Sequence, residues 1–196
     1  VHLSPTSFQK EKDRLWASKW GTAFALTLIA SLWVVFRIPV NAYLPPDQIA
    51  GKLVMIYCLS AIPFYFAGLV ISGLFAAYPE QVGKLYAWDL IGAGLGAILI
   101  LPLMNFVGGE SAAIFISVGG LTATYFFAGK RFRMVVLGLL AAMLLLGLVN
   151  QNVGLLKIKY AKGSPVQHMD VRYNKWNSFS KVTVIPFRPN ANEVYT

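Results

Sequence analysis

Residues 85–129 read LYAWDLIGAGLGAILILPLMNFVGGESAAIFISVGGLTATYFFAG. Only two side chains in this stretch carry a charge, Asp89 and Glu110. About 20 consecutive apolar residues are enough for a helix to cross a bilayer. We therefore predict two membrane-spanning helices, residues 85–109 and 111–129, joined by a tight turn at Gly108-Gly109-Glu110.

Three further apolar runs lie on either side of this stretch, at residues 20–40, 53–79 and 134–156. The first has its full length only if the Arg37 side chain extends along the helix to the interface. The second contains Pro63, which we predict to kink that helix because proline removes a helical hydrogen bond. The sequence therefore predicts an all-α integral membrane helix bundle, with about five transmembrane helices and a short C-terminal β tail.

The composition excludes several other classes of protein. Hydrophobic residues make up 57% of the 196 residues, charged residues 13%, and the mean hydropathy is +0.59. A soluble domain of this size has too high a surface-to-volume ratio to bury so much apolar surface. The single cysteine, Cys58, cannot form an internal disulfide. We expect a multi-pass protein of a bacterial inner (cytoplasmic) membrane.

Polar segments precede and follow the predicted bundle. Residues 1–19 have mixed charge and are predicted to be partly helical, with Trp16 and Trp20 as anchors at the membrane interface. Residues 157–196 form a soluble basic tail, in which residues 181–187 alternate between polar and apolar as a β-strand does. A lone strand is not stable in water. We therefore expect the tail to pack on the membrane domain, on a partner or on further chain.

The distribution of basic residues predicts the orientation. Those on the N-terminal side are Lys10, Lys12, Arg14, Lys19, Lys84, Lys130, Arg131 and Arg133. Those near the membrane on the other side are Arg37, Lys52, Lys157, Lys159 and Lys162. Basic loops stay in the cytoplasm, so the larger first set predicts a cytoplasmic N-terminus. We interpret the lysines after residue 156 as a collar for lipid headgroups and expect no nucleic-acid partner.

Glycines in two of the predicted helices have the spacing of helix-packing sites. Gly92 and Gly96 are four residues apart, with Gly94 between them, and small residues at this spacing let helix backbones approach closely in lipid. We predict that this helix is the centre of the bundle, and that Gly68 and Gly73 serve the same purpose in the preceding helix. A dinucleotide-binding loop is excluded because the glycines do not follow a strand.

Asp89 is the one acidic residue inside a predicted span, one turn into its helix. A carboxylate at mid-membrane costs about 2.5–3.5 kcal/mol on insertion scales, so it needs a partner, the interface or a polar cavity. We predict a structural acid with a fixed partner, such as a helix-end amide, a neighbouring Tyr or Trp, or Lys84. The alternative is a proton or cation site.

No other residues form a recognisable catalytic or metal-binding set. His2 and His168 lie far apart on the polar termini, without metal-ligand spacing. Cys58 has no neighbouring histidine and is predicted to be a small core residue rather than a nucleophile. We therefore predict no catalytic residue, metal or cofactor. Whether a lipid or pigment is bound is left open.

Three segments carry a resemblance to a known family. LYAWDLIGAGLGAILILPLMNFVGG (85–109) resembles the signature helix of membrane-embedded spermidine synthase-like proteins, in which an Asp precedes a Gly/Ala-rich run. AIPFYFAGLVISGLFAAYPEQVGKLYAWD (61–89) extends the likeness upstream. KWNSFSKVTVIP (175–186) is similar to the segment that opens the aminopropyltransferase-like domain of those fusions. The resemblance covers roughly residues 53–187.

The resemblance implies a Rossmann-like domain after the membrane region. In the family this domain binds decarboxylated S-adenosylmethionine, or a relative, at a Gly-rich loop with acidic partners, and it transfers an aminopropyl group to a polyamine. The tail here has no such loop, and its acids are Asp170 and Glu193. We therefore carry over no catalytic residue and lean toward a chain that is not itself an enzyme. A cytoplasmic cosubstrate would place the tail inside, opposite to the charge count.

Three functions follow from these observations. The first is a non-catalytic multi-pass subunit or scaffold, which packs against other membrane protein subunits within the bilayer. The second is the membrane anchor of an aminopropyltransferase-like enzyme whose catalytic domain is not in this chain. The third is a small transporter that uses Asp89 and a kink at Pro63.

Overall fold

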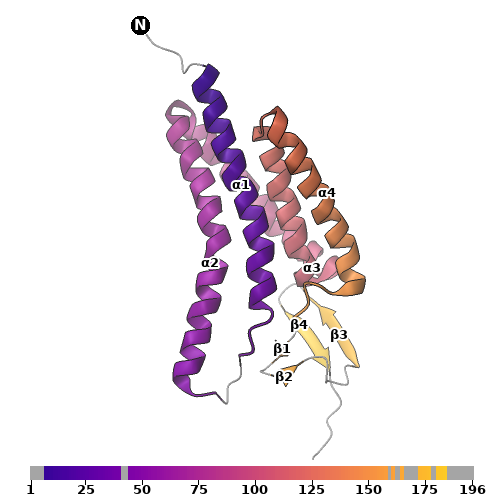
Figure 1. Ribbon diagram of the computed structural model, residues 1–196. Coiled ribbons are helices and arrows are strands. Elements are labelled where there is room, and N and C mark those ends of the chain that lie inside the picture. The colour runs from indigo at the N-terminus through magenta and orange to yellow at the C-terminus, as the bar shows by residue number, and fades with distance from the viewer. Residues whose placement is uncertain are drawn as a thin grey trace, which may run out of the picture.

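The computed structural model describes residues 7–40, 44–158, 160–161, 164–165, 172–177 and 180–184. Within them the chain is mostly helical (Figure 1). The four long helices are α1 (Ser7–Val35), α2 (Pro46–Ala77), α3 (Val82–Phe127) and α4 (Lys130–Val153). Each contains an apolar stretch long enough to cross a membrane, which is the pattern of an integral membrane protein.

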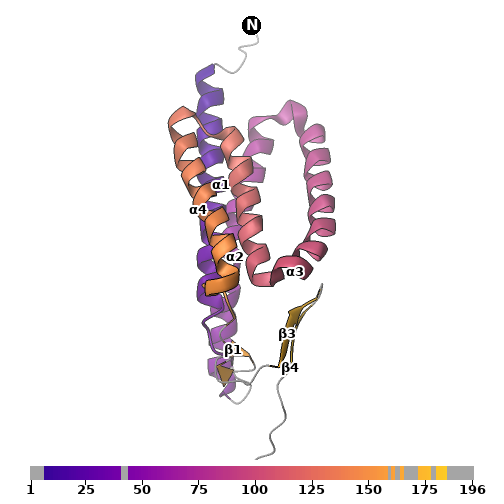
Figure 2. The same cartoon turned by 90° about the vertical axis from the view of Figure 1, so that its right-hand side faces the viewer.

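The described residues form four long helices, rather than the five predicted. The spans predicted at residues 85–109 and 111–129 belong to one element, the 46-residue α3. Inside α3, Gly108 has non-helical dihedral angles, φ 80° and ψ 159°. At this residue α3 turns back on itself, as Figure 2 shows. The helix therefore has a first limb (82–107) and a second limb (109–127). The predicted turn is therefore a sharp bend within one continuous element, and no separate loop divides the two runs.

The other helix ends also differ from the predicted spans. α1 begins at Ser7, so the N-terminal segment that is predicted to be partly helical continues directly into the first span, and α1 ends at Val35 rather than near residue 40. α2 begins at Pro46, where proline lacks only an N–H that the first turn of a helix does not need. α2 runs through Pro63 to Ala77, and the Pro63 ring is buried. The non-helical dihedral angles recorded within the described helices lie at Gly108, and the kink at Pro63 stays a prediction.

The core lies between α1, α4 and the second limb of α3. A cluster of buried residues fills it: Ala25, Leu121, Ala128, Val136 and Met143. Small residues bring the backbones close. The Ser117 hydroxyl donates a hydrogen bond across helices to the Ala25 carbonyl at 2.9 Å, and the Phe24 ring covers Gly120. α2 packs along α1 on the other side.

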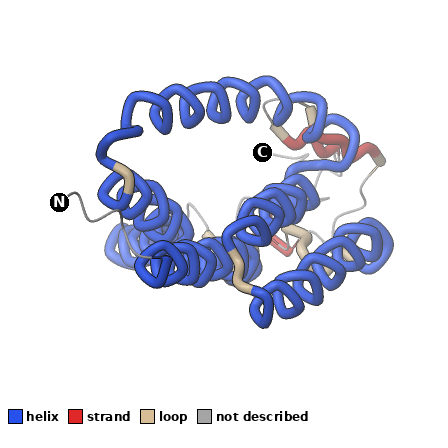
Figure 3. Tube along the Cα trace, turned by 90° about the horizontal axis from the view of Figure 1, so that it is seen from above, coloured by secondary structure: helices blue, strands red, loops and turns tan. Residues whose placement is uncertain are grey.

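The first limb of α3 differs from the rest of the bundle. A short 3-10 helix, η1 (Pro79–Gln81), connects it to α2. In residues 82–107, all of which the structure describes, no residue is buried. The limb runs apart from the other helices toward the strands, as the views from the side and from above agree (Figures 2 and 3). Many of the exposed side chains of this limb are large and apolar, such as Trp88, Ile98 and Phe106.

Two small antiparallel sheets follow α4, at the opposite end from the start of α1 (Figure 1). β1 (Tyr160–Ala161) pairs with β2 (Ser164–Pro165), and β3 (Tyr173–Trp176) pairs with β4 (Lys181–Val184). β4 falls within the strand predicted at residues 181–187, of which 185–187 lie outside the described residues. In the β3–β4 hairpin, Trp176 is directly opposite Lys181.

Candidate functional site

The bend of α3 forms a notch that receives an aromatic ring from the tail. A Cβ atom added to Gly108 would lie 2.9 Å from the Trp176 ring, and one added to Gly109 would lie 2.8 Å from it. Both distances are closer than a side chain can tolerate without movement of the ring. Gly108 also has a positive φ, which glycine adopts without steric cost. The Gly-Gly pair therefore makes both the bend and the space for Trp176.

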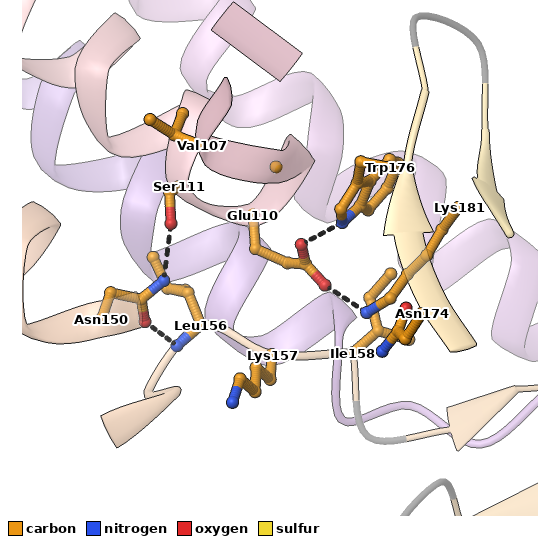
Figure 4. Close-up of a pocket in the computed structure, with 11 residues that line it drawn as sticks. Val107, Glu110, Ser111, Asn150, Leu156, Lys157, Ile158, Asn174, Trp176 and Lys181 are labelled. Atoms are coloured by element: carbon orange, nitrogen blue, oxygen red, sulfur yellow. Dashed lines mark hydrogen bonds and ion pairs between the residues drawn. The ribbon is translucent and has the colours of Figure 1, made fainter. Parts of the chain in front are cut away.

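Glu110 attaches the hairpin to this notch through one contact with each of the two strands. The Trp176 indole Nε1–H donates a hydrogen bond of 2.5 Å to Oε2 of Glu110. The Lys181 ammonium lies 2.7 Å from Oε1 of the same carboxylate (Figure 4). Glu110 is buried, with 7% of its surface exposed. Since each carboxylate oxygen has its own donor, the charge that the fold buries here is both paired and hydrogen-bonded.

A second polar cluster closes the end of α4 beside the notch. The Asn150 side chain is buried, donates a hydrogen bond to the Ser111 hydroxyl at 3.2 Å, and accepts one from the Leu156 backbone N–H at 2.8 Å. α4 then ends at Val153 and is capped by Gly154, whose φ of 64° is the left-handed conformation typical of the residue that follows a helix. Asn150 therefore fixes both the second limb of α3 and the chain that leaves α4.

These groups line a pocket of about 400 Å³ between the bend, the end of α4 and the hairpin (Figure 4). Its lining residues are Val107, Gly108, Glu110, Ser111, Asn150, Leu156, Lys157, Ile158, Asn174, Trp176 and Lys181. The one carboxylate among them already has two donors, so it is engaged in fixing the hairpin rather than available as a base. Among the residues that the structure describes, no group of three or more His, Cys, Asp or Glu side chains is placed to hold a metal.

The structure corrects the prediction that the glycine stripe of the third predicted helix is the centre of this chain's bundle. Gly92, Gly94 and Gly96 lie on the exposed first limb of α3, and an added Cβ would meet no atom within 4 Å at any of them. The same is true of Gly68 in α2. The reason is the bend at Gly108, which directs the second limb into the bundle and leaves the first outside it.

The remaining predicted packing residues lie between α1 and α2. A Cβ added to Gly73 would lie 2.1 Å from the Trp16 ring, so this glycine makes room for the indole. The Trp20 ring stacks on Phe66, with centroids 5.4 Å apart. Trp16 and Trp20, which we predicted as interface anchors, thus both contact α2.

Asp89 is exposed on the first limb of α3 and lines neither of the pockets described in this article. Within the described residues it has no hydrogen bond or ion pair, so the structure does not provide the fixed partner, such as Lys84, that we predicted. Cys58, predicted as a core residue, is exposed on α2. His2 and His168 lie outside the described residues.

Sequence reasoning missed the residues that the fold brings together, namely Glu110, Asn150, Trp176 and Lys181. Glu110 was predicted only as part of a turn, and Asn150 only as part of the span at residues 134–156. The pattern that could have identified them is a single acid at a Gly-Gly turn, together with a Trp and a Lys that face each other on two paired strands. Sequence separation hides such a pairing, because Lys181 follows Glu110 by 71 positions.

Comparison of the chain with protein-family models, with curated proteins and with solved structures gives no match. The resemblance to spermidine synthase-like proteins therefore stays a hypothesis.

Proposed function

We propose that this chain is a non-catalytic multi-pass membrane subunit or scaffold, which packs against other subunits of a larger membrane assembly. One observation carries the proposal: the first limb of α3 stands outside the bundle and exposes Gly92, Gly94 and Gly96. The other helices cover none of these three positions. A partner helix is the occupant that their spacing fits.

The physics of helix association in lipid supports this interpretation. Apolar side chains gain nothing by leaving lipid for a protein surface, so helices associate where small residues allow close van der Waals contact. Two of the described glycines that pack inside this chain, Gly73 and Gly120, already have aromatic rings over them. The glycine stripe on the first limb would likewise allow another helix to approach closely, and it remains available to another subunit.

The size of the assembly extracted in mild detergent tests the proposal. Gly96→Leu should shift the assembly to a smaller species on native electrophoresis, because the larger side chain separates the two backbones. Gly138→Leu is the matched control, since Gly138 is an exposed glycine of α4 whose added Cβ also meets nothing within 4 Å. An identical size for wild type and Gly96→Leu would reject the proposal.

The second function, an anchor for an aminopropyltransferase-like domain, is favoured by the attachment of the hairpin. Glu110 contacts both β3 and β4, so the position of the hairpin is fixed relative to the membrane helices. A domain that continued from β4 would be held at a defined position. The transport function gains no such support, because Asp89 lines neither pocket.

We also propose that the chain resides in a bacterial inner membrane with the start of α1 in the cytoplasm. The hairpin and the start of α1 lie at opposite ends of the bundle (Figure 1). The N-terminal side carries eight basic residues and the hairpin side carries five near the membrane, which favours this orientation. Variants that lack Cys58 and carry a single cysteine at one end of the bundle test this orientation. The measurement is whether an impermeant thiol reagent reaches the cysteine at each end.

A further inference from the structure

An apolar groove of about 520 Å³ lies between α1 and α4, away from the first limb of α3. The residues that line it are Leu26, Ile29, Ala30, Trp33, Val34, Met143, Leu146, Leu155 and Leu156. All of them are apolar, and Trp33 is 46% exposed. A groove with this lining fits a hydrocarbon chain.

A guanidinium group is held against one wall of the groove. The central carbon of the Arg37 guanidinium lies 3.7 Å from the centroid of the Trp33 ring. Its Nη1 donates a hydrogen bond of 2.7 Å to the Trp33 carbonyl. These two contacts fix the group just beyond the end of α1. A guanidinium carries five N–H donors, so several remain for an anion.

A lysine follows the residues of the opposite wall in the sequence. Leu156, which is 1% exposed, lines both the apolar groove and the polar pocket beside Glu110. The next residue, Lys157, is exposed and lines the polar pocket. Arg37 therefore lies against the groove on the α1 side, and Lys157 directly follows the groove-lining Leu156 on the α4 side. Both residues come just after the helix ends nearest the hairpin (Figure 1).

We propose that this groove binds one anionic phospholipid, with an acyl chain along the apolar lining and the phosphate near Arg37 and Lys157. Basic sites between membrane helices are a recognised chemistry for acidic headgroups. Neither of the two described acids near this end of the bundle lines the groove. Glu110 is paired with Lys181, and Asp47 lies in the first turn of α2, which does not line the groove. The proposal is independent of the assembly proposed above.

Native mass spectrometry of the full chain tests the proposal. The protein is released from nanodiscs that contain phosphatidylglycerol and phosphatidylcholine in equal amounts, and the retained lipids are identified. Wild type should retain phosphatidylglycerol preferentially. Arg37→Gln and Lys157→Gln should each lower that preference by roughly fivefold, the effect of one cation close to an anionic headgroup. Lys84→Gln is the control, because Lys84 is exposed in the first turn of α3, at the other end of the bundle.

A second variant tests the apolar part of the site. Ala30 is exposed in the groove, so Ala30→Trp should fill it without disturbing the core and should reduce retention of both lipids. Helical circular dichroism identifies any variant that has not folded. The proposal is overturned if wild type retains both lipids equally, if neither charge variant changes the preference, or if folded Ala30→Trp retains lipid as wild type does.

Discussion

Lys181 and Glu110 form an ion pair across 71 positions of sequence, with Nζ 2.7 Å from Oε1. The acid comes from the bend of a membrane helix and the base from a strand of the tail. The side chains are 20% and 9% exposed, so most of the pair is shielded from water. The contact joins the apolar bundle to the β3–β4 hairpin, which would be marginal as an isolated two-stranded unit.

Removal of the carboxylate charge should therefore release the hairpin. Glu110→Gln keeps an acceptor for Trp176 but leaves Lys181 without its counter-ion, and we expect a loss of about 1–3 kcal/mol in the stability of the docked hairpin. Amide hydrogen exchange in residues 173–184 should become faster, while exchange in α4 stays unchanged. The control is Glu80→Gln, since Glu80 is an exposed acid of η1. Equal exchange in Glu110→Gln and Glu80→Gln would contradict the role assigned to the pair.

The notch under Trp176 predicts a steric effect at the bend. Gly109→Ala places a Cβ 2.8 Å from the Trp176 ring, and Gly108→Ala adds the strain of a positive φ, about 1–3 kcal/mol. Both variants should displace the indole and lower the midpoint of thermal unfolding. Gly119→Ala in the same helix has open space and should unfold as wild type does. An unchanged midpoint in both bend variants would show that Trp176 does not need the notch.

The contact between α1 and α2 gives a matched pair of glycine variants in one helix. Gly73→Ala meets the Trp16 ring, whereas Gly68→Ala meets nothing within 4 Å. We expect Gly73→Ala to destabilise the protein by about 1–3 kcal/mol, the usual cost of overpacking, and Gly68→Ala to be neutral. Thermal unfolding in detergent, followed by circular dichroism, measures both. Equal midpoints would mean that the Trp16 side chain moves aside freely.

Asn150 predicts a polar effect at the end of α4. Asn150→Leu removes the acceptor of the buried Leu156 N–H and the donor to Ser111, which should cost about 1–3 kcal/mol per unsatisfied group. Asn152→Leu, at an exposed position two residues later, is the control. The variants are compared by hydrogen exchange at Leu156, whose amide should lose protection only in Asn150→Leu. Retained protection would show that another acceptor replaces Asn150.

The sequence allowed prediction of membrane helices and of a strand after them, because hydropathy and alternation depend on neighbouring residues. It did not allow prediction of how the third helix is used. Gly108 and Gly109 predict a turn, but a turn alone does not determine which of the flanking runs enters the bundle. Gly92 and Gly96 have packing spacing, yet the second limb, with Ser117 and Gly120, is the one that packs on α1.

The candidate site was beyond prediction for a related physical reason. Glu110 is a single acid in an apolar context, and its partners lie on a hairpin whose position depends on the three-dimensional path of the chain. Asn150 presented the same difficulty, because its partner Ser111 lies 39 positions away. Local patterns carry no information on such pairings without a homologous sequence or a structure.

Site-specific photocrosslinking from Leu95, between Gly94 and Gly96 on the first limb of α3, tests the central claim most directly. A photoreactive residue at this exposed position is activated in native membranes, with Leu144 of α4 as the exposed control. If the limb packs against a subunit, position 95 should give one discrete protein adduct, which is absent from position 144 and lost when Gly96→Leu is added. Crosslinks from position 95 to lipid alone would contradict the proposal that this chain is an assembly subunit.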